Sequence, residues 1–312
     1  MAKERDTDIL TVAAVREGTE GQEILFNERQ QIFTLASSVK SGAETLSRLR
    51  SVIKKGEPVR AVLDPKRGVV EKIETPAADE AERFLKARVL EKEPSKSIKI
   101  NVRGIDPTVF NVVNERLKWG AFNLCQKTVP NYAKAKEIFD FCAKQSCHLP
   151  GPYDISPCIP FQYVRDGCYA RAHKMRWIIT TKYKYCCEKV FSFANQGSDR
   201  LAVKADKWGG CCVTWWYHVA PLIRVKVSLG KISFSLAYVI DPSMFDKPVL
   251  LSTWLAAQEN TTCHASANVS MYSIQPGSAY TPANSAGTQF TTDPNYTATD
   301  ATLLAYAGLT TC

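Results

Sequence analysis

The spacing of hydrophobic and polar residues in the first third of the chain predicts a small α+β unit. The first helix is the clearest element, because Leu46, Leu49 and Ile53 fall on one face and Gly56 ends it. In chain order, the expected elements are a strand-like segment at 24–36, this helix at 41–56, two short strands within 58–74 and a second helix at 75–92.

A polar, charged segment broken by a proline, residues 91–97, predicts a linker after this unit. Beyond the linker, residues 211–230 and 231–243 alternate like two long antiparallel strands that meet near Gly230. From about Cys263 onward, the many Ser, Thr and Asn residues predict coil and short strands. Helices are expected at 106–123, 131–147 and 168–182. We therefore expect two units, 1–97 and 98–312, both of the α+β class.

The cysteines are confined to the second unit. All eleven lie between Cys125 and Cys312, and residues 1–97 contain none. Their spacing does not repeat the C-x-x-C pattern of zinc sites, so we expect disulfides and no metal. Disulfides indicate an oxidising compartment, and the start MAKERDTDIL is not a signal peptide. We expect a secreted protein whose signal peptide is absent from this sequence. Because the number of cysteines is odd, at least one thiol is expected to be unpaired.

The formal net charge of +9 is unevenly distributed. Residues 1–97 carry 18 Lys and Arg against 17 Asp and Glu, whereas residues 98–312 carry 22 against 14. This excess is not gathered into a Lys/Arg block, so a nucleic-acid partner is not expected. Without a run of about 18 apolar residues, a membrane-spanning helix is not expected either.

Cys168 is the candidate for the unpaired thiol. In the segment DGCYARAHKMR, a turn at Asp166-Gly167 is followed by a predicted helix that starts at the cysteine. The helix dipole and the backbone N–H groups at that end would lower the pKa of a thiol and stabilise an oxyanion. The alternative is a structural disulfide, which is the usual fate of a cysteine in such a domain.

A thiolate nucleophile needs a base, and His218 is the candidate among four histidines. It lies in the predicted strand WWYHVA, where a histidine can also be a plain core residue. If this strand pairs with the next one around Gly230, the register brings His218 close to Asp241 in VIDPS. A carboxylate bonded to one ring nitrogen leaves the other to face the thiol. Asp241 alone would mark a common turn, but the three residues together suit thiol acyl transfer in a papain- or transglutaminase-like core.

Aromatic residues surround the histidine. Trp208, Trp215, Trp216 and Tyr217 form either a substrate platform or plain core. Because successive strand residues point to opposite faces, only half of them can do either. Trp215 and Tyr217 are the better candidates for the walls of a cleft.

These segments closely resemble the bacterial protein-glutaminases, which are secreted protein deamidases. The resemblance is carried by DGCYARAHKMR, by CC-V-x-W-x-YHVA and by IDPS-x-F, and GEPVRAVLDPKRGVVEKIE resembles the family's pro-region. It implies that Cys168 is the nucleophile, His218 its base and Asp241 the orienting acid. The implied reaction converts protein-bound glutamine to glutamate through a thioester, with release of ammonia and without a cofactor.

The resemblance also implies a precursor. Residues 1–97 would be an inhibitory pro-region, released by an activating protease, and residues 98–312 the mature catalytic domain. We expect Gln30 or Gln31 to lie near Cys168 in the place of a substrate glutamine. Trp216 stands where the family commonly has a small residue, which puts substrate preference in question.

Two alternatives remain at this stage. A cysteine protease or a transglutaminase would use the same three residues, since the sequence does not reveal which acceptor reacts with the thioester. A secreted binding module without enzymatic activity would instead hold Cys168 in a disulfide.

Overall fold

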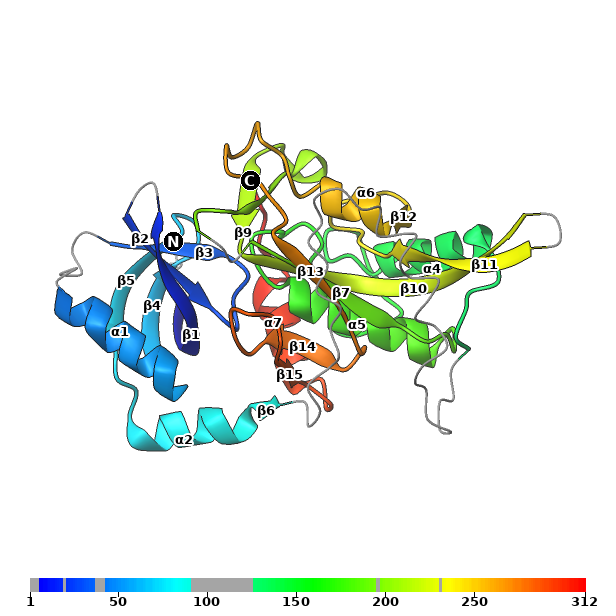
Figure 1. The fold of residues 1–312 in the computed structure, drawn as a ribbon. Helices are drawn as coiled ribbons and strands as arrows, with labels where there is room; N and C mark the ends of the chain where they lie inside the picture. The colour runs from blue at the N-terminus through cyan, green and yellow to red at the C-terminus, as the bar shows by residue number, and fades with distance from the viewer. Residues whose placement is uncertain (1–5, 19–20, 37–42, 91–125, 195–196, 230–231) are drawn as a thin grey trace.

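The structure is a computed structural model, and the residues that it describes are 6–18, 21–36, 43–90, 126–194, 197–229 and 232–312. The helix expected at 106–123 and the linker expected at 91–97 lie outside these residues. The described part forms a barrel that leans against a larger sheet-and-helix unit, blue to cyan and green to red in Figure 1. The α+β class expected from the sequence is confirmed.

The N-terminal unit is a closed five-stranded barrel with the strand order β1-β2-β3-β5-β4. Its core includes Leu10, Ile24, Phe33, Val59 and Val70, which are all buried. The long first strand had no counterpart in the predicted elements. The bounds are β1 (Asp6–Gly18), β2 (Gly21–Phe26), β3 (Ile32–Leu35), α1 (Ala43–Lys55), β4 (Pro58–Asp64), β5 (Val69–Glu74) and α2 (Ala78–Ala87).

Helix α2 is shorter than the sequence predicts. It begins at Ala78 instead of residue 75, with Ala77 as its N-cap, and it ends at Ala87 instead of continuing to 92. It ends early because β6 (Val89–Leu90) pairs with β15 (Phe290–Thr292) of the second unit. The chain is thereby joined to the larger unit before residue 91.

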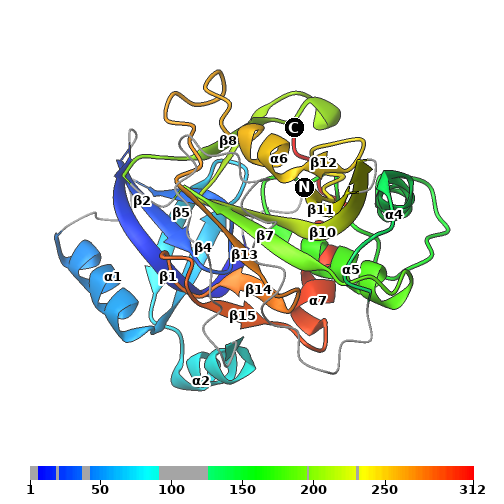
Figure 2. The ribbon, with the colours of Figure 1, turned by 45° about the vertical axis from the view of Figure 1, so that its right-hand side comes forward.

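The second unit is built on a five-stranded sheet of order β12-β11-β10-β7-β13. Helix α5 lies along β10, as Figures 1 and 2 show, and most of its residues are buried. The bounds are α4 (Tyr132–Lys144), α5 (Cys168–Thr181), β7 (Glu188–Phe193), β8 (Leu201–Lys204), β9 (Cys212–Trp215), β10 (Tyr217–Leu229), β11 (Ile232–Val239), β12 (Val249–Leu250), α6 (Leu251–Ala256), β13 (Met271–Gln275), β14 (Ala279–Pro282), β15 and α7 (Thr297–Tyr306).

The C-terminal tail is more ordered than the sequence suggests. Short strands do form there, but β13 completes the main sheet beside β7. Helix α7, which is rich in Thr and was not predicted, packs against α5 through buried Leu303 and Tyr306. Thr has a low helix propensity, so tertiary packing and not local sequence accounts for this helix.

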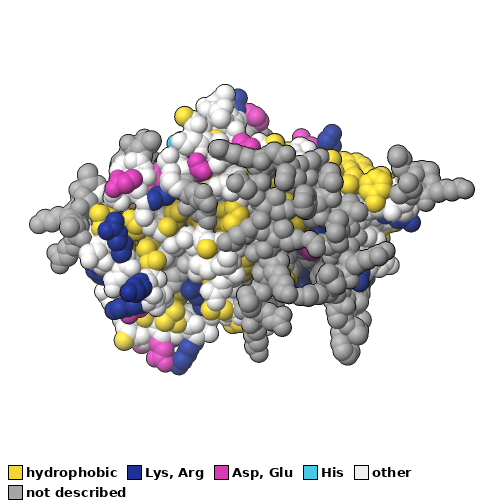
Figure 3. All heavy atoms as spheres, viewed as in Figure 1, with side chains coloured by type: hydrophobic (Ala, Val, Ile, Leu, Met, Phe, Trp, Pro, Cys, Tyr) yellow, Lys and Arg dark blue, Asp and Glu magenta, His cyan; other side chains and the backbone are white. Residues whose placement is uncertain are grey.

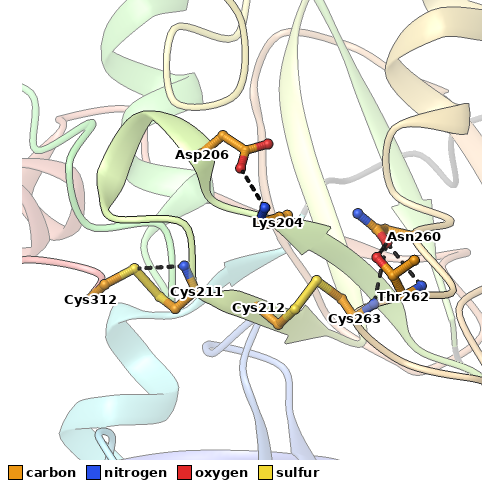
Figure 4. Close-up of a disulfide and its surroundings, with 8 residues drawn as sticks. All are labelled: Lys204, Asp206, Cys211, Cys212, Asn260, Thr262, Cys263 and Cys312. Carbon is orange, nitrogen blue, oxygen red and sulfur yellow. Dashed lines mark hydrogen bonds and ion pairs between the residues drawn. A yellow bond between two sulfur atoms is a disulfide. The ribbon is translucent and has the colours of Figure 1, made fainter.

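Two disulfides anchor the chain just before the candidate site. Cys211 is bonded to Cys312, and Cys212 to Cys263, so the C-terminus and a distant loop are both tied to the start of β9 (Figure 4). A third disulfide joins Cys147 to Cys158. The bonds of Cys211 and Cys212 hold the start of β9, the strand that precedes His218.

Charged side chains of both signs lie on the described surface. On the face shown in Figure 3, Lys and Arg side chains lie among Asp and Glu side chains. None of the described helices combines the length and the apolar character needed to cross a bilayer.

Candidate active site

Cys168 is the first residue of α5, as predicted, and its thiol is unpaired and buried. Gly167 is the N-cap, with a left-handed φ of 80°. A Cβ atom there would lie 2.8 Å from the Tyr306 ring, so both the backbone angle and the close packing require glycine. The tight turn DG thus presents the sulfur and the backbone N–H of Cys168 at the end of the helix.

His218 and Asp241 meet as the strand register predicts. Strand β10 pairs with β11 so that Leu222 opposes Val239, which carries the two residues toward each other beyond the paired region. Nε2 of His218 lies 2.9 Å from Oδ2 of Asp241. The other ring nitrogen, Nδ1, is buried and makes no hydrogen bond to any described residue.

The imidazole is held between two indole rings. Trp215 stacks on one side with ring centroids 4.6 Å apart, and Trp254 on the other at 5.3 Å. Trp254 also donates through Nε1 to Asp241 over 2.9 Å, and the Ser243 hydroxyl donates to the same carboxylate. The carboxylate is therefore fixed in position by three donors, and the imidazole by two rings and one hydrogen bond.

These contacts determine the ionisation of Asp241. Burial by itself raises the pKa of a carboxyl group, but the hydrogen bonds from His218, Ser243 and Trp254 outweigh it and lower the pKa of Asp241 to about 2. The side chain is thus a carboxylate at neutral pH and is able to orient the imidazole.

The thiol lies against the histidine strand. The backbone N–H of Val219, the residue after His218, donates to the sulfur of Cys168. Burial raises the pKa of the Cys168 thiol well above its ordinary value, although Arg171 and this N–H group oppose the change. The sequence predicts a lowered pKa from the helix end. In this closed form desolvation outweighs that effect, so the thiol is protonated.

Arg171 is a buried cation one turn along the helix from Cys168. Its Nη1 donates to the backbone oxygens of Tyr163 and Asp166, both over 2.6 Å. Its Nη2 has no hydrogen-bond partner among the described residues. This positive charge acts to lower the pKa of the Cys168 thiol, against the larger effect of burial.

The N-terminal unit inserts a glutamine into this site. The side-chain oxygen of Gln30 accepts a hydrogen bond of 2.8 Å from the backbone N–H of Cys168, and its amide group donates to Val164 O over 3.1 Å. The Gln30 side chain is completely buried. A carboxamide thus lies at the helix end that carries the thiol.

Gln31 points elsewhere. Its amide group donates to Pro65 O, within the barrel, over 2.7 Å. Its backbone forms an antiparallel bridge with Trp215. Of the two glutamines considered, Gln30 contacts Cys168, and Gln31 joins the same segment to β9 through a single backbone bridge.

The aromatic residues expected near the cleft make different contacts. Trp215 and Tyr217 are both fully buried, and Trp215 contacts the inserted segment through its bridge to Gln31. Trp216 holds that segment more closely. Its backbone N–H donates to Gln30 O over 3.1 Å, and its indole donates to Arg29 O over 2.7 Å. The indole of Trp208 donates to Ser243 O, the backbone oxygen of a residue whose hydroxyl binds Asp241.

Several contributors were missed in the sequence. Ser243 is part of the motif IDPS and could have been found as a neighbour of Asp241. Arg171 lies three residues after Cys168, on the same face of the helix. Trp254 carries no local signal, because only the fold of α6 brings it to the imidazole.

The pH dependence of stability provides a test of the carboxylate environment. The pKa of Asp241 is about 2 in the folded chain and about 3.9 in an unfolded one. A lowered folded-state pKa stabilises the fold above pH 4, and this contribution disappears as the pH falls toward 2. We expect Asp241→Asn to remove on the order of 2 kcal/mol at pH 7.

Denaturant unfolding from pH 7 down to pH 2 measures this effect. The difference between wild type and Asp241→Asn should shrink as the pH falls below 4. The control is Asp246→Asn, because the Asp246 side chain is 87% exposed and pairs with Lys207 at the surface. A difference that stays constant across the pH range would contradict the assignment.

Comparison with known proteins agrees with the sequence resemblance. A family model described as glutaminase matches residues 135–258. A crystal structure of pro-protein-glutaminase is 27% identical, with a TM-score of 0.73 over 99% of this chain and 95% of that chain. A crystal structure of protein-glutaminase is 36% identical over 60% of this chain and 92% of that chain, with a TM-score of 0.50. The chain belongs to the protein-glutaminase family. No curated protein sequence matches it.

A second structure of protein-glutaminase is similar to the chain to the same extent. The NMR structure of protein-glutaminase from Chryseobacterium proteolyticum is 35% identical and covers the same shares of the two chains, with a TM-score of 0.50. The structure titled pro-protein-glutaminase matches nearly the whole chain, whereas those titled protein-glutaminase match 60% of it. The chain is thus similar to the precursor form of the family.

Proposed function

We propose that this chain is the precursor of a protein-glutaminase that uses Cys168, His218 and Asp241 to deamidate protein-bound glutamine. The observation that carries the proposal is the Gln30 carboxamide, whose oxygen accepts the Cys168 N–H over 2.8 Å. A side-chain carboxamide is the group that a protein-glutaminase hydrolyses. This contact places one beside Cys168, the only thiol that begins a described helix.

In the proposed reaction the thiolate of Cys168 attacks the side-chain carbonyl carbon of a substrate glutamine. The carbonyl oxygen becomes an oxyanion, which accepts a hydrogen bond from the backbone N–H of Cys168 at the positive end of α5. His218 takes the thiol proton and passes it to the departing ammonia, while Asp241 holds the ring. His218 then activates the water that hydrolyses the thioester to glutamate.

We further propose that residues 1–97 are an inhibitory pro-region. Gln30 is fully buried and Cys168 is 1% exposed, so a substrate has no access while the barrel is in place. Without cysteines, these residues have no disulfide to the rest of the chain once the linker is cut. A protease that cuts near 91–97 would release them, in the extracellular setting that the disulfides favour.

Trp215 and Trp216 are the proposed walls of the substrate cleft. Both hold the segment that contains Gln30, through the Gln31 bridge and through donation to Arg29 O and Gln30 O. Tyr217 lies buried in the same core and was the other residue expected to line the cleft.

A protein substrate distinguishes the proposed activity from its alternatives. The activated enzyme is expected to release ammonia from a glutamine-rich protein, with no new peptide termini and no cross-linked products. Peptide cleavage would indicate a protease, and cross-linking in the presence of an amine would indicate a transglutaminase. The binding-module alternative lacks support, because Cys168 is not in a disulfide.

A further inference from the structure

The inserted segment is held by its backbone as well as by the Gln30 side chain. The N–H of Gln30 donates to Oδ1 of Asp166 over 3.1 Å, and its carbonyl oxygen accepts from Trp216 N–H over 3.1 Å. Both peptide groups that flank the glutamine are thus bound by the second unit. Because these are backbone contacts, a substrate can make them only if its glutamine is part of a polypeptide chain. They do not depend on the side chains of the neighbouring residues.

The residue before the glutamine makes a contact that does depend on its chemistry. Nη1 of Arg29 lies 2.8 Å from Oδ2 of Asp166, and the Tyr306 hydroxyl donates to the same oxygen over 2.8 Å. The Tyr306 hydroxyl also contacts the Arg29 guanidinium directly. One buried carboxylate therefore binds the backbone of residue 30 and the side chain of residue 29.

The Asp166 carboxylate also accepts a hydrogen bond from the backbone N–H of Gly167, within the turn that precedes α5. Asp166 is 2% exposed, and the N-cap of α5 is Gly167, without a side-chain cap. The neighbouring cation Arg171 bonds to the backbone oxygen of Asp166 through Nη1. Removal of the pro-region would take away the guanidinium and the Gln30 N–H, and leave the carboxylate with the Gly167 N–H and the Tyr306 hydroxyl, and with no partner for the charge that Arg29 supplied.

Within the pro-region Arg29 has two further acidic neighbours, Asp8 and Asp6. Both belong to β1 and would depart with the barrel. Asp166 and Tyr306, which both contact the Arg29 side chain, belong to the second unit and stay when the barrel departs. Their contribution can therefore be measured separately from that of the pro-region.

We propose that Asp166 and Tyr306 form a subsite for a basic residue immediately before the reactive glutamine, so that the enzyme prefers Arg-Gln sequences in its protein substrates. This inference rests on the proposed function. A charge-assisted hydrogen bond at a largely buried carboxylate discriminates between side chains far more than an exposed pair does. A glutamate in the same position would face Asp166 with like charge and be rejected.

The test compares four short peptides, blocked at both ends, that differ only in the residue before a single glutamine. That residue is arginine, its neutral isostere citrulline, alanine or glutamate. For the activated enzyme we expect kcat/KM for ammonia release to be about tenfold higher for arginine than for citrulline, and lowest for glutamate. The ratio of arginine to citrulline should decrease as salt is added.

Two variants assign the preference to the subsite. Asp166→Asn should bring the arginine and citrulline peptides to similar kcat/KM values, and Tyr306→Phe should reduce their ratio in part. Equal kcat/KM values for arginine and citrulline in the wild-type enzyme would overturn the inference, whether or not the variants fold. Ammonia release from none of the peptides and from no protein would instead overturn the proposed function, and the subsite with it.

Discussion

In the activated enzyme, Cys168→Ala is expected to lower the rate of ammonia release from a glutamine-containing protein by at least about 10,000-fold. The sulfur is the proposed nucleophile, and removal of a nucleophile leaves only the contribution of substrate binding and of the N–H group at the helix end. The measurement is the initial rate of ammonia release under saturating protein substrate, after the linker has been cut.

The matched control is Cys187→Ala. Cys187 is a second unpaired, buried cysteine, and its sulfur donates to Glu188 O, away from His218. This variant should keep its activity within a few fold of wild type if it folds. A Cys168→Ala enzyme that retains a tenth of the wild-type rate would show that another group attacks the amide.

The three residues of the candidate site could be predicted because each carries a local signal. Cys168 follows a DG turn and begins a helix, and Gly167 has the left-handed φ that this turn needs. His218 and Asp241 lie nearly equidistant from the turn between β10 and β11, and an antiparallel register converts that spacing into proximity. Local sequence and strand pairing thus suffice to suggest the hydrogen bond between them.

The ionisation of the thiol could not be predicted in the same way. A helix end lowers the pKa of a thiol, but the sequence does not reveal that Gln30 and the barrel bury Cys168 in this form. The partners of Asp241 show the same limit, because Trp254 reaches the carboxylate only through the fold of α6. Effects that depend on burial need the tertiary structure.

The choice between Gln30 and Gln31 also lies beyond the sequence. The two residues are adjacent and chemically identical, so only the register of the segment against β9 decides which one reaches the thiol. That register is set by the bridge of Gln31 to Trp215 and by the donation of Trp216 N–H to Gln30 O. In the same way, α7 and the early end of α2 depend on partners distant in sequence.

The uncut precursor is expected to release ammonia at least about a hundredfold more slowly than the cut enzyme, because a tethered segment competes at an effective concentration in the millimolar range. Gln30→Glu should raise the rate of the uncut precursor about tenfold or more. A carboxylate oxygen would replace the amide group that donates to Val164 O over 3.1 Å, so the inserted side chain would face a carbonyl oxygen without a proton between them. Labelling of Cys168 by a thiol reagent should increase in parallel.

Gln31→Glu is the matched control for this prediction. It makes the same substitution opposite another backbone oxygen, that of Pro65, but within the barrel and away from Cys168. If Gln30 inhibits by occupying the site, Gln30→Glu should raise both the rate and the labelling much more than Gln31→Glu does. Equal increases in the two variants would mean that the substitutions weaken the barrel as a whole, and that occupation of the site by Gln30 is not what restrains the enzyme.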